Sequence, residues 1–118
     1  MRVFSNTAIS LDGRINTRDD LPPALGTPQD LRRMKQLRAQ ADAVLVGGAT
    51  FRHWPIASLP EPEALVGRTT PFWNVIVTRS FQLTPRESFL AETRIRPLFL
   101  TVAGHAPPSF PAEIEVYP

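Results

Sequence analysis

The segment Ala41–Thr50, which reads ADAVLVGGAT, places the strongest constraint on how this 118-residue chain can fold. Within it, Ala43–Val46 is a short unbroken apolar run. Such runs are typical of strands that are covered on both faces, as in a parallel sheet. Gly47 and Gly48 follow at once and predict a turn into the next element. The segment therefore predicts a buried strand of an α/β fold.

The remaining elements are expected to alternate around this strand. A helix is predicted from Thr27 to Gln40, because Thr27 is a good N-cap, Pro28 suits the first helical position, and apolar residues recur at helical spacing. A short helix is predicted after the glycines, at Phe51–Trp54. Apolar runs predict four further strands, at Val3–Ile9, Phe72–Thr78, Leu98–Val102 and Ile114–Tyr117. Loops are expected at 17–26, 55–70 and 103–111. The order predicts one α/β domain, residues 1–118, with parallel neighbouring strands flanked by helices.

Composition narrows the class of protein. A 118-residue chain with 42% hydrophobic and 20% charged residues can bury one core, which argues against intrinsic disorder. The absence of cysteine excludes disulfides and thiolate metal sites. No apolar run approaches the roughly 20 residues that cross a bilayer, and the start of the chain lacks a signal-peptide stretch. We expect a soluble, cytoplasmic protein without membrane contact.

The basic residues are almost all arginine. The net charge is +2 with a pI of 9.9, and Lys35 is the single lysine among 13 basic residues. Because the arginines are scattered along the chain, nucleic-acid binding is not expected. Arginine pairs with phosphate in a bidentate way, so a phosphorylated ligand fits this bias. Genomic base composition would produce the same bias without any ligand.

The glycine turn is the first candidate binding site. Gly47 and Gly48 allow a ligand to approach the backbone closely, N–H groups at the start of the next helix can hold phosphate, and Thr50 adds a hydroxyl donor. In open α/β sheets such turns lie at the carboxyl ends of strands, where ligands bind. A plain tight turn between strand and helix would read the same way. The pattern is neither a GxGxxG fingerprint nor a P-loop.

Two further motifs follow predicted strands. Thr78, Arg79 and Ser80 could grip a phosphate such as the 2′-phosphate of NADPH, or form a solvated turn with a surface arginine. Ser10 and Asp12 stand in the SLDGR segment, where Asp12 could accept a hydrogen bond from a ligand or bond its own backbone in an Asp-Gly turn.

The histidines and the tryptophan after the glycine turn predict no metal site. His53 and His105 lie far apart, and no carboxylate stands at metal-ligand spacing from either. His105 is expected to be exposed in a loop. His53 could line a pocket, and Trp54 could stack on a ring, but surface and packing roles are the simpler interpretation.

Three ordered blocks together resemble the reductase domain of riboflavin biosynthesis, whose best-known member is 5-amino-6-(5-phosphoribosylamino)uracil reductase. These blocks are Thr7–Ile15 (TAISLDGRI), Leu37–Gly47 (LRAQADAVLVG) and Asn74–Ser80 (NVIVTRS). The resemblance covers nearly the whole chain. It implies a dihydrofolate-reductase-like fold, with a mainly parallel sheet flanked by helices.

The resemblance also implies a cofactor and an activity. NADPH would be bound by Gly47, Gly48 and Thr50 near its phosphates. The 2′-phosphate and ribose would lie near the residues Thr78, Arg79 and Ser80. Ser10 and Asp12 would lie near the nicotinamide and substrate, as candidate catalytic residues. The implied function is NADPH-dependent reduction of a small pyrimidine- or pterin-like molecule, with the chemistry carried by the cofactor.

Two departures from the family qualify this expectation. After the glycine turn the chain reads Phe51–Pro55 (FRHWP), which looks closer to the Thr-Phe-x-x-x-Pro run of dihydrofolate reductases than to the riboflavin enzymes. The family domain also continues beyond a strand like Ile114–Tyr117, with another glycine turn, so we expect this chain to be the N-terminal portion of such a domain. A non-catalytic nucleotide-binding or assembly module is the alternative. An open sheet edge would favour a homo-oligomer.

Overall fold

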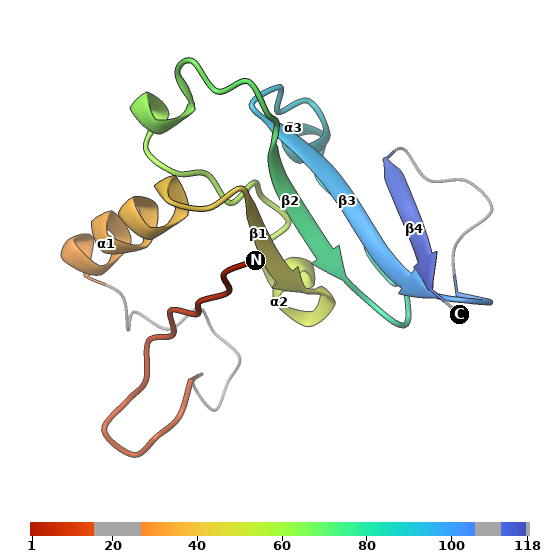
Figure 1. Ribbon diagram of the computed structural model, residues 1–118. Coiled ribbons are helices and arrows are strands. Elements are labelled where there is room, and N and C mark those ends of the chain that lie inside the picture. Colours follow the sequence, from red (N-terminus) through yellow and green to blue (C-terminus); the bar gives the residue numbers. More distant parts are fainter. Residues whose placement is uncertain (16–26, 106–111, 118) are drawn as a thin grey trace.

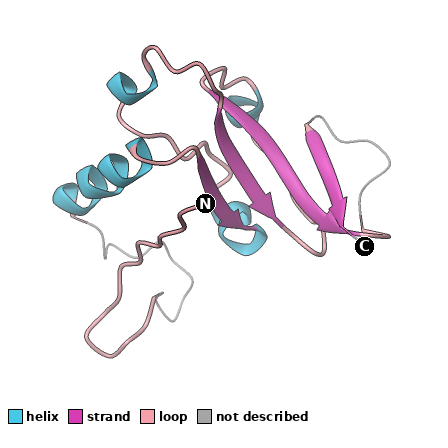
Figure 2. Cartoon of the chain, viewed as in Figure 1, coloured by secondary structure: helices cyan, strands magenta, loops and turns pink. Residues whose placement is uncertain are grey.

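One parallel sheet organises the protein, and its strands lie side by side in chain order, β1-β2-β3-β4 (Figures 1 and 2). The computed structural model describes residues 1–15, 27–105 and 112–117. Its strands are β1 (Ala43–Gly47), β2 (Phe72–Val77), β3 (Ile95–Val102) and β4 (Glu113–Tyr117). Its helices are α1 (Pro28–Ala39), α2 (Gly48–His53), the 3₁₀ helix η1 (Pro62–Leu65) and α3 (Glu87–Leu90). In the described residues each strand pairs in parallel with the next, which confirms the predicted α/β fold.

The core lies on one face of the sheet, between β2, β3 and the helices α2 and α3. Phe99 in β3 is fully buried and makes edge-on ring contacts with Phe51 of α2 and Phe89 of α3, at centroid distances of 6.0 and 6.3 Å. The buried apolar residues of the cluster are Phe51, Phe72, Ile76, Phe81, Leu83, Phe89, Ile95 and Phe99. Burying each phenylalanine stabilises the fold by about 1.5–3 kcal/mol. These rings fix α2 and α3 over the sheet.

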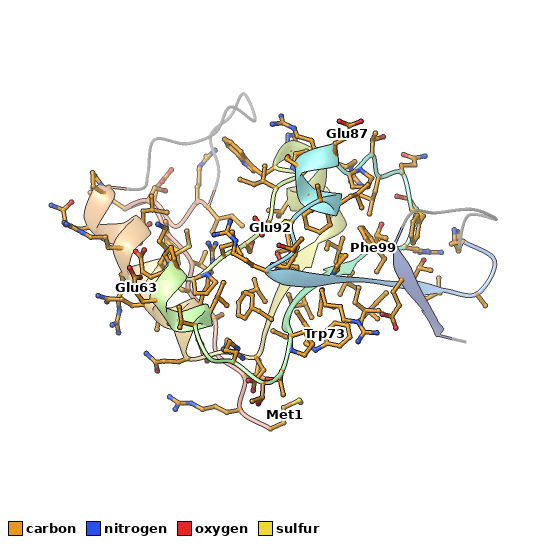
Figure 3. All side chains as sticks on the ribbon, turned by 90° about the horizontal axis from the view of Figure 1, so that it is seen from above. Met1, Glu63, Trp73, Glu87, Glu92 and Phe99 are labelled. Carbon is orange, nitrogen blue, oxygen red and sulfur yellow. The ribbon has the colours of Figure 1, made fainter. Side chains whose placement is uncertain are left out.

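The other face of the sheet is largely open in the part of the chain that the structure describes. Figure 3 shows Trp73 on the opposite side of the β3 ribbon from α3. The Arg96 guanidinium lies 4.7 Å from the centre of the Trp73 ring, and Leu45 of β1 is 67% exposed. The expectation that Ala43–Val46 would be covered on both faces is therefore wrong within these residues, because no described helix lies over Leu45.

Helix α1 forms for the predicted reasons. The Thr27 hydroxyl accepts a hydrogen bond from the Asp30 N–H at 3.2 Å, and Pro28 occupies the first turn. Two contacts tie α1 to the loop before η1: Arg38 donates to the Leu59 carbonyl at 3.2 Å, and Lys35 pairs with Glu61 at 3.4 Å. None of the described helices is both long and apolar enough to cross a membrane.

The strand predicted at Val3–Ile9 is wrong. Within the described residues this segment has no sheet partner, and Val3 and Ile9 are 80% and 63% exposed. Its residues have strand propensity, but a strand also needs the backbone groups of a neighbour. The predicted Asp-Gly turn that follows is confirmed, since Gly13 has a φ of +79° and donates to the Ser10 carbonyl at 2.9 Å. The loop predicted at 17–26 and residues 106–111 of the loop predicted at 103–111 lie outside the described residues.

Other boundaries differ from the sequence predictions by a few residues. Helix α2 starts at Gly48, three residues before the predicted helix, and β3 starts at Ile95, three residues before the predicted strand. The single-turn helix α3 was not predicted. The apolar strands β1 and β2 match their predicted ranges to within one residue.

Candidate functional site

A hollow of about 370 Å³ opens beside the carboxyl ends of β1 and β2. Its walls come from α2, from the segment that follows β2, and from the turn after β3. The residues that line it are Gly48, Ala49, Arg52, Val77, Thr78, Arg79, Ser80 and His105. Ligands of open α/β sheets bind in this position, outside the carboxyl ends of the strands. Its size falls in the lower part of the range of small-molecule sites.

The hollow brings together two motifs that lie thirty residues apart in the sequence. Gly48 from the glycine turn shares it with Thr78, Arg79 and Ser80. The parallel register explains this meeting, because Gly47 at the end of β1 pairs with Val77 at the end of β2. Gly47 and Thr50 adjoin the hollow in sequence but do not line it.

Gly48 is required by close packing. A Cβ atom at this position would lie 2.8 Å from the Thr78 Oγ1 and 2.9 Å from the Thr78 Cβ. Both distances are shorter than any ordinary contact, so the glycine lets α2 approach the end of β2. Gly47 is different, because a Cβ there would meet nothing within 4 Å. Packing within the protein therefore requires a glycine at position 48 but not at position 47.

The charges in the hollow have one sign. Arg52, Arg79 and His105 line it, and among the residues that the structure describes no aspartate or glutamate does. Neither Arg52 nor Arg79 forms an ion pair with the described residues, although Arg68 and Arg94 elsewhere pair with carboxylates at 2.9 and 2.6 Å. Three cationic or ionisable groups without a neutralising carboxylate favour an anionic ligand.

Two threonines lie side by side at this edge of the sheet. Because Val77 pairs with Leu100, the next positions, Thr78 and Thr101, are neighbours on the face that also carries Phe99. Both threonines are buried, and the Thr101 hydroxyl has no hydrogen-bond partner among the described residues. A buried hydroxyl without a partner costs about 1–3 kcal/mol, which makes it a candidate donor for a ligand or an ordered water. Thr78 lines the hollow, whereas Thr101 lies beside it without lining it.

The segment after β2 contains a residue with an unusual backbone conformation. Phe81 has a φ of +49°, a left-handed conformation that is rare for a bulky residue. Its ring is buried and lies 5.9 Å from the ring of Phe99. Burial of this ring stabilises the strained conformation directly after the bend at Arg79 and Ser80. Arg79 and Ser80 are thereby kept on the wall of the hollow.

The predicted catalytic residues lie elsewhere. The Ser10 hydroxyl donates to the Asp12 carboxylate, whose other oxygen lies 2.9 Å from the Arg14 guanidinium. Asp12 and Arg14 are about two-thirds exposed, and the turn satisfies its own polar groups. The structure does not bring Ser10 or Asp12 into the lining of the hollow. Their catalytic role stays a prediction.

Arg52 and His105 were not among the predicted site residues. Arg52 lies four residues after Gly48, so the two share one face of α2, and this spacing is the signal that could have found it. His105 reaches the hollow because β3 ends beside β2, which no local pattern reveals. His53 and Trp54 are exposed and do not line the hollow. In the described ranges no three potential metal ligands gather in one place.

Comparison with known sequences identifies the family. A sequence profile of the RibD C-terminal domain matches residues 1–110. Searches among curated proteins and among solved structures gave no significant match. The matched range contains the glycine turn, the Thr78–Ser80 segment and the three strands β1 to β3. The chain belongs to the RibD C-terminal domain family, the reductase domain of riboflavin biosynthesis with a dihydrofolate-reductase-like α/β fold.

Proposed function

We propose that this chain binds NADPH and serves a reductase that acts on a pyrimidine- or pterin-like substrate of riboflavin biosynthesis. One observation carries the proposal: the two motifs expected to hold the cofactor meet in a single hollow that contains arginines and no carboxylate. Family membership supports the reductase activity.

Each motif has a distinct role in this proposal. The guanidinium of Arg79, with the hydroxyls of Thr78 and Ser80, would bind the 2′-phosphate and ribose, since bidentate arginine contacts suit phosphate oxygens. The backbone of Gly47 and Gly48 and the hydroxyl of Thr50 would bind the other phosphates. Helix α2 has only six residues, so the cationic side chains supply most of the attraction.

When bound, NADPH would supply the hydride, and the protein would bind and orient the reactants. Asp12 is the candidate for moving a proton to the substrate, with Ser10 positioning it. In the structure Asp12 is paired with Arg14. Proton transfer by Asp12 therefore requires that this exposed ion pair opens when substrate binds.

The alternative is a nucleotide-binding or assembly module without catalysis. Its basis is that Ser10 and Asp12 do not line the hollow within the described residues, whereas family membership supports the reductase. A test of turnover separates the two functions. Oxidation of NADPH that depends on the substrate and is lost in Asp12→Asn supports the reductase, whereas cofactor binding without turnover supports the module.

Cofactor binding is tested first by titrating NADPH and NADH while following the fluorescence of the nicotinamide. We expect NADPH to bind more tightly than NADH, and Arg79→Ala to remove most of this preference. Circular dichroism checks that the variant is folded. No binding of NADPH at high micromolar concentration by the folded protein, or equal losses for both cofactors in Arg79→Ala, would reject the assignment.

A further inference from the structure

Arg52 is a second guanidinium in the hollow, and neither sequence motif contains it. It lies in the last turn of α2, on the same helix face as Gly48, the point of closest approach to Thr78. The side chain is exposed and has no ion pair or hydrogen bond within the described residues. Its position on α2 therefore directs it toward the wall formed by Thr78 and Arg79.

A purely structural role accounts for only part of this placement. A cation in the last turn of a helix is favoured by the helix dipole. His53 stands in the same turn but does not line the hollow, whereas Arg52 does. The dipole explains why a basic residue suits this turn. It does not explain why the permanently charged residue, and not His53, lines the same hollow as the unpaired Arg79.

The two arginines come from different elements and line the same hollow, which is large enough for a small ligand. Arg52 belongs to α2, and Arg79 follows β2. Their charges repel each other, and no carboxylate of the lining offsets this repulsion. A phosphate monoester carries close to two negative charges and three acceptor oxygens, so it can accept bonds from both guanidiniums at once. A phosphodiester, with one charge per phosphate, matches two guanidiniums less well.

We propose that Arg52 is a specificity-determining residue, which together with Arg79 holds one phosphate monoester in the hollow and so selects the phosphorylated dinucleotide over the unphosphorylated one. The identity of the cofactor rests on the proposed function above. The phosphate subsite itself requires only a nucleotide that carries a monoester, such as adenosine 2′-monophosphate.

The test compares four ligands on the wild type, three single variants and the double variant Arg52→Gln/Arg79→Gln. NADPH and adenosine 2′-monophosphate carry the monoester, and NADH and adenosine lack it. The wild type is compared with Arg52→Gln, Arg79→Gln and Arg32→Gln. The last is a matched control, because Arg32 is an exposed arginine of α1 that lies outside the hollow and is unpaired within the described residues.

Arg52→Gln should weaken NADPH and adenosine 2′-monophosphate by about tenfold, as expected for the loss of one charge-assisted contact, with NADH and adenosine unchanged. Arg32→Gln should leave all four affinities within about twofold of the wild type, because a distant surface charge is screened. If the two arginines hold the same phosphate, the effects of Arg52→Gln and Arg79→Gln on NADPH binding should not add in the double variant.

The outcomes separate this inference from the proposed function. If Arg79→Gln removes the preference for NADPH while Arg52→Gln behaves like Arg32→Gln, the role of Arg52 is overturned and the function stands. If the wild type binds adenosine 2′-monophosphate through Arg52 but does not bind NADPH, the subsite stands and the proposed function is overturned. Binding of neither ligand by the folded protein overturns both.

Discussion

Replacing Gly48 by alanine should disturb the fold and the hollow together. The added Cβ would lie 2.8 Å from the Thr78 Oγ1 and 2.9 Å from the Thr78 Cβ. Thr78 is only 7% exposed, so its side chain cannot swing into solvent. Overpacking of this kind costs about 1–3 kcal/mol, and the better helix propensity of alanine returns up to about 1 kcal/mol. We expect a net loss of about 1–2 kcal/mol of unfolding free energy.

The neighbouring glycine is the matched control. Gly47 has φ −71° and ψ 146°, angles that any residue adopts, and a Cβ there meets nothing within 4 Å. Alanine at position 47 loses a favourable N-cap but also restricts the unfolded chain, and these effects of about 1 kcal/mol nearly cancel. In urea unfolding, the midpoint of Gly48→Ala should lie about 0.5–1 M below that of Gly47→Ala. Equal midpoints would show that the close approach of α2 to Thr78 does not exist.

A double variant tests the assigned contact directly. Thr78→Gly removes both atoms that would lie closer than 3.0 Å to the new Cβ and leaves only the Val77 carbonyl oxygen, at 3.4 Å. Gly48→Ala combined with Thr78→Gly should therefore be less destabilised than the sum of the single variants, by roughly the overpacking cost of 1–3 kcal/mol. Strict additivity would place the cost of Gly48→Ala elsewhere in the protein.

Three further predictions concern the rest of the fold. Asn74 is buried, and its side chain accepts a hydrogen bond from the Ser58 N–H at 2.7 Å and donates one to the Ser58 carbonyl at 3.3 Å. Asn74→Ala should lower the free energy of unfolding by about 1–3 kcal/mol and speed hydrogen exchange at the Ser58 amide. An unchanged exchange rate would contradict this. Hydrogen bonds from Arg94 lower the pKa of Glu92 to about 2, below the usual value of about 4.3, so the pair stabilises the protein above that usual value and the stabilisation is lost as the pH falls toward 2. Glu92→Gln should flatten the decline of urea midpoints over this acid range, and identical slopes would refute the linkage. Strand β1 has an unpaired outer edge in the described residues, and Leu45 on it is exposed, so we propose that the protein self-associates. Light scattering that finds only a 13.1 kDa species at micromolar concentration would refute this proposal.

The elements that were predicted correctly are those encoded by local chemistry. Helix α1 begins at its predicted cap, because the Thr27 hydroxyl accepts from the Asp30 N–H within one turn and Pro28 suits the first turn. Strand β1 is continuous and ends at the glycines, as expected for an unbroken run of β-branched and apolar residues. Neither element needs a distant partner to be recognised.

The wrong predictions concern elements whose existence or boundaries depend on residues distant in the sequence. Val3–Ile9 has the composition of a strand, but pairing depends on a neighbour that the pattern does not specify. The apolar run predicts that β3 begins at Leu98, directly after Pro97, and a proline cannot donate to a ladder. The structure carries β3 through Pro97, since the pairing with β4 begins only at Leu98. The missing N–H therefore costs nothing on that side of the strand.

The hollow also depends on residues that are distant in the sequence, because contacts in the core set its position. A six-residue helix such as α2 is unstable alone, because helix nucleation is unfavourable. What holds α2 is Phe51, whose ring lies 4.9 Å from that of Phe89 and 6.0 Å from that of Phe99. Arg52 is the next residue along the chain. Its place in the hollow that Arg79 also lines is thus set by an aromatic contact that sequence alone could not locate, and packing defects at Phe51 should weaken phosphate binding before they unfold the sheet.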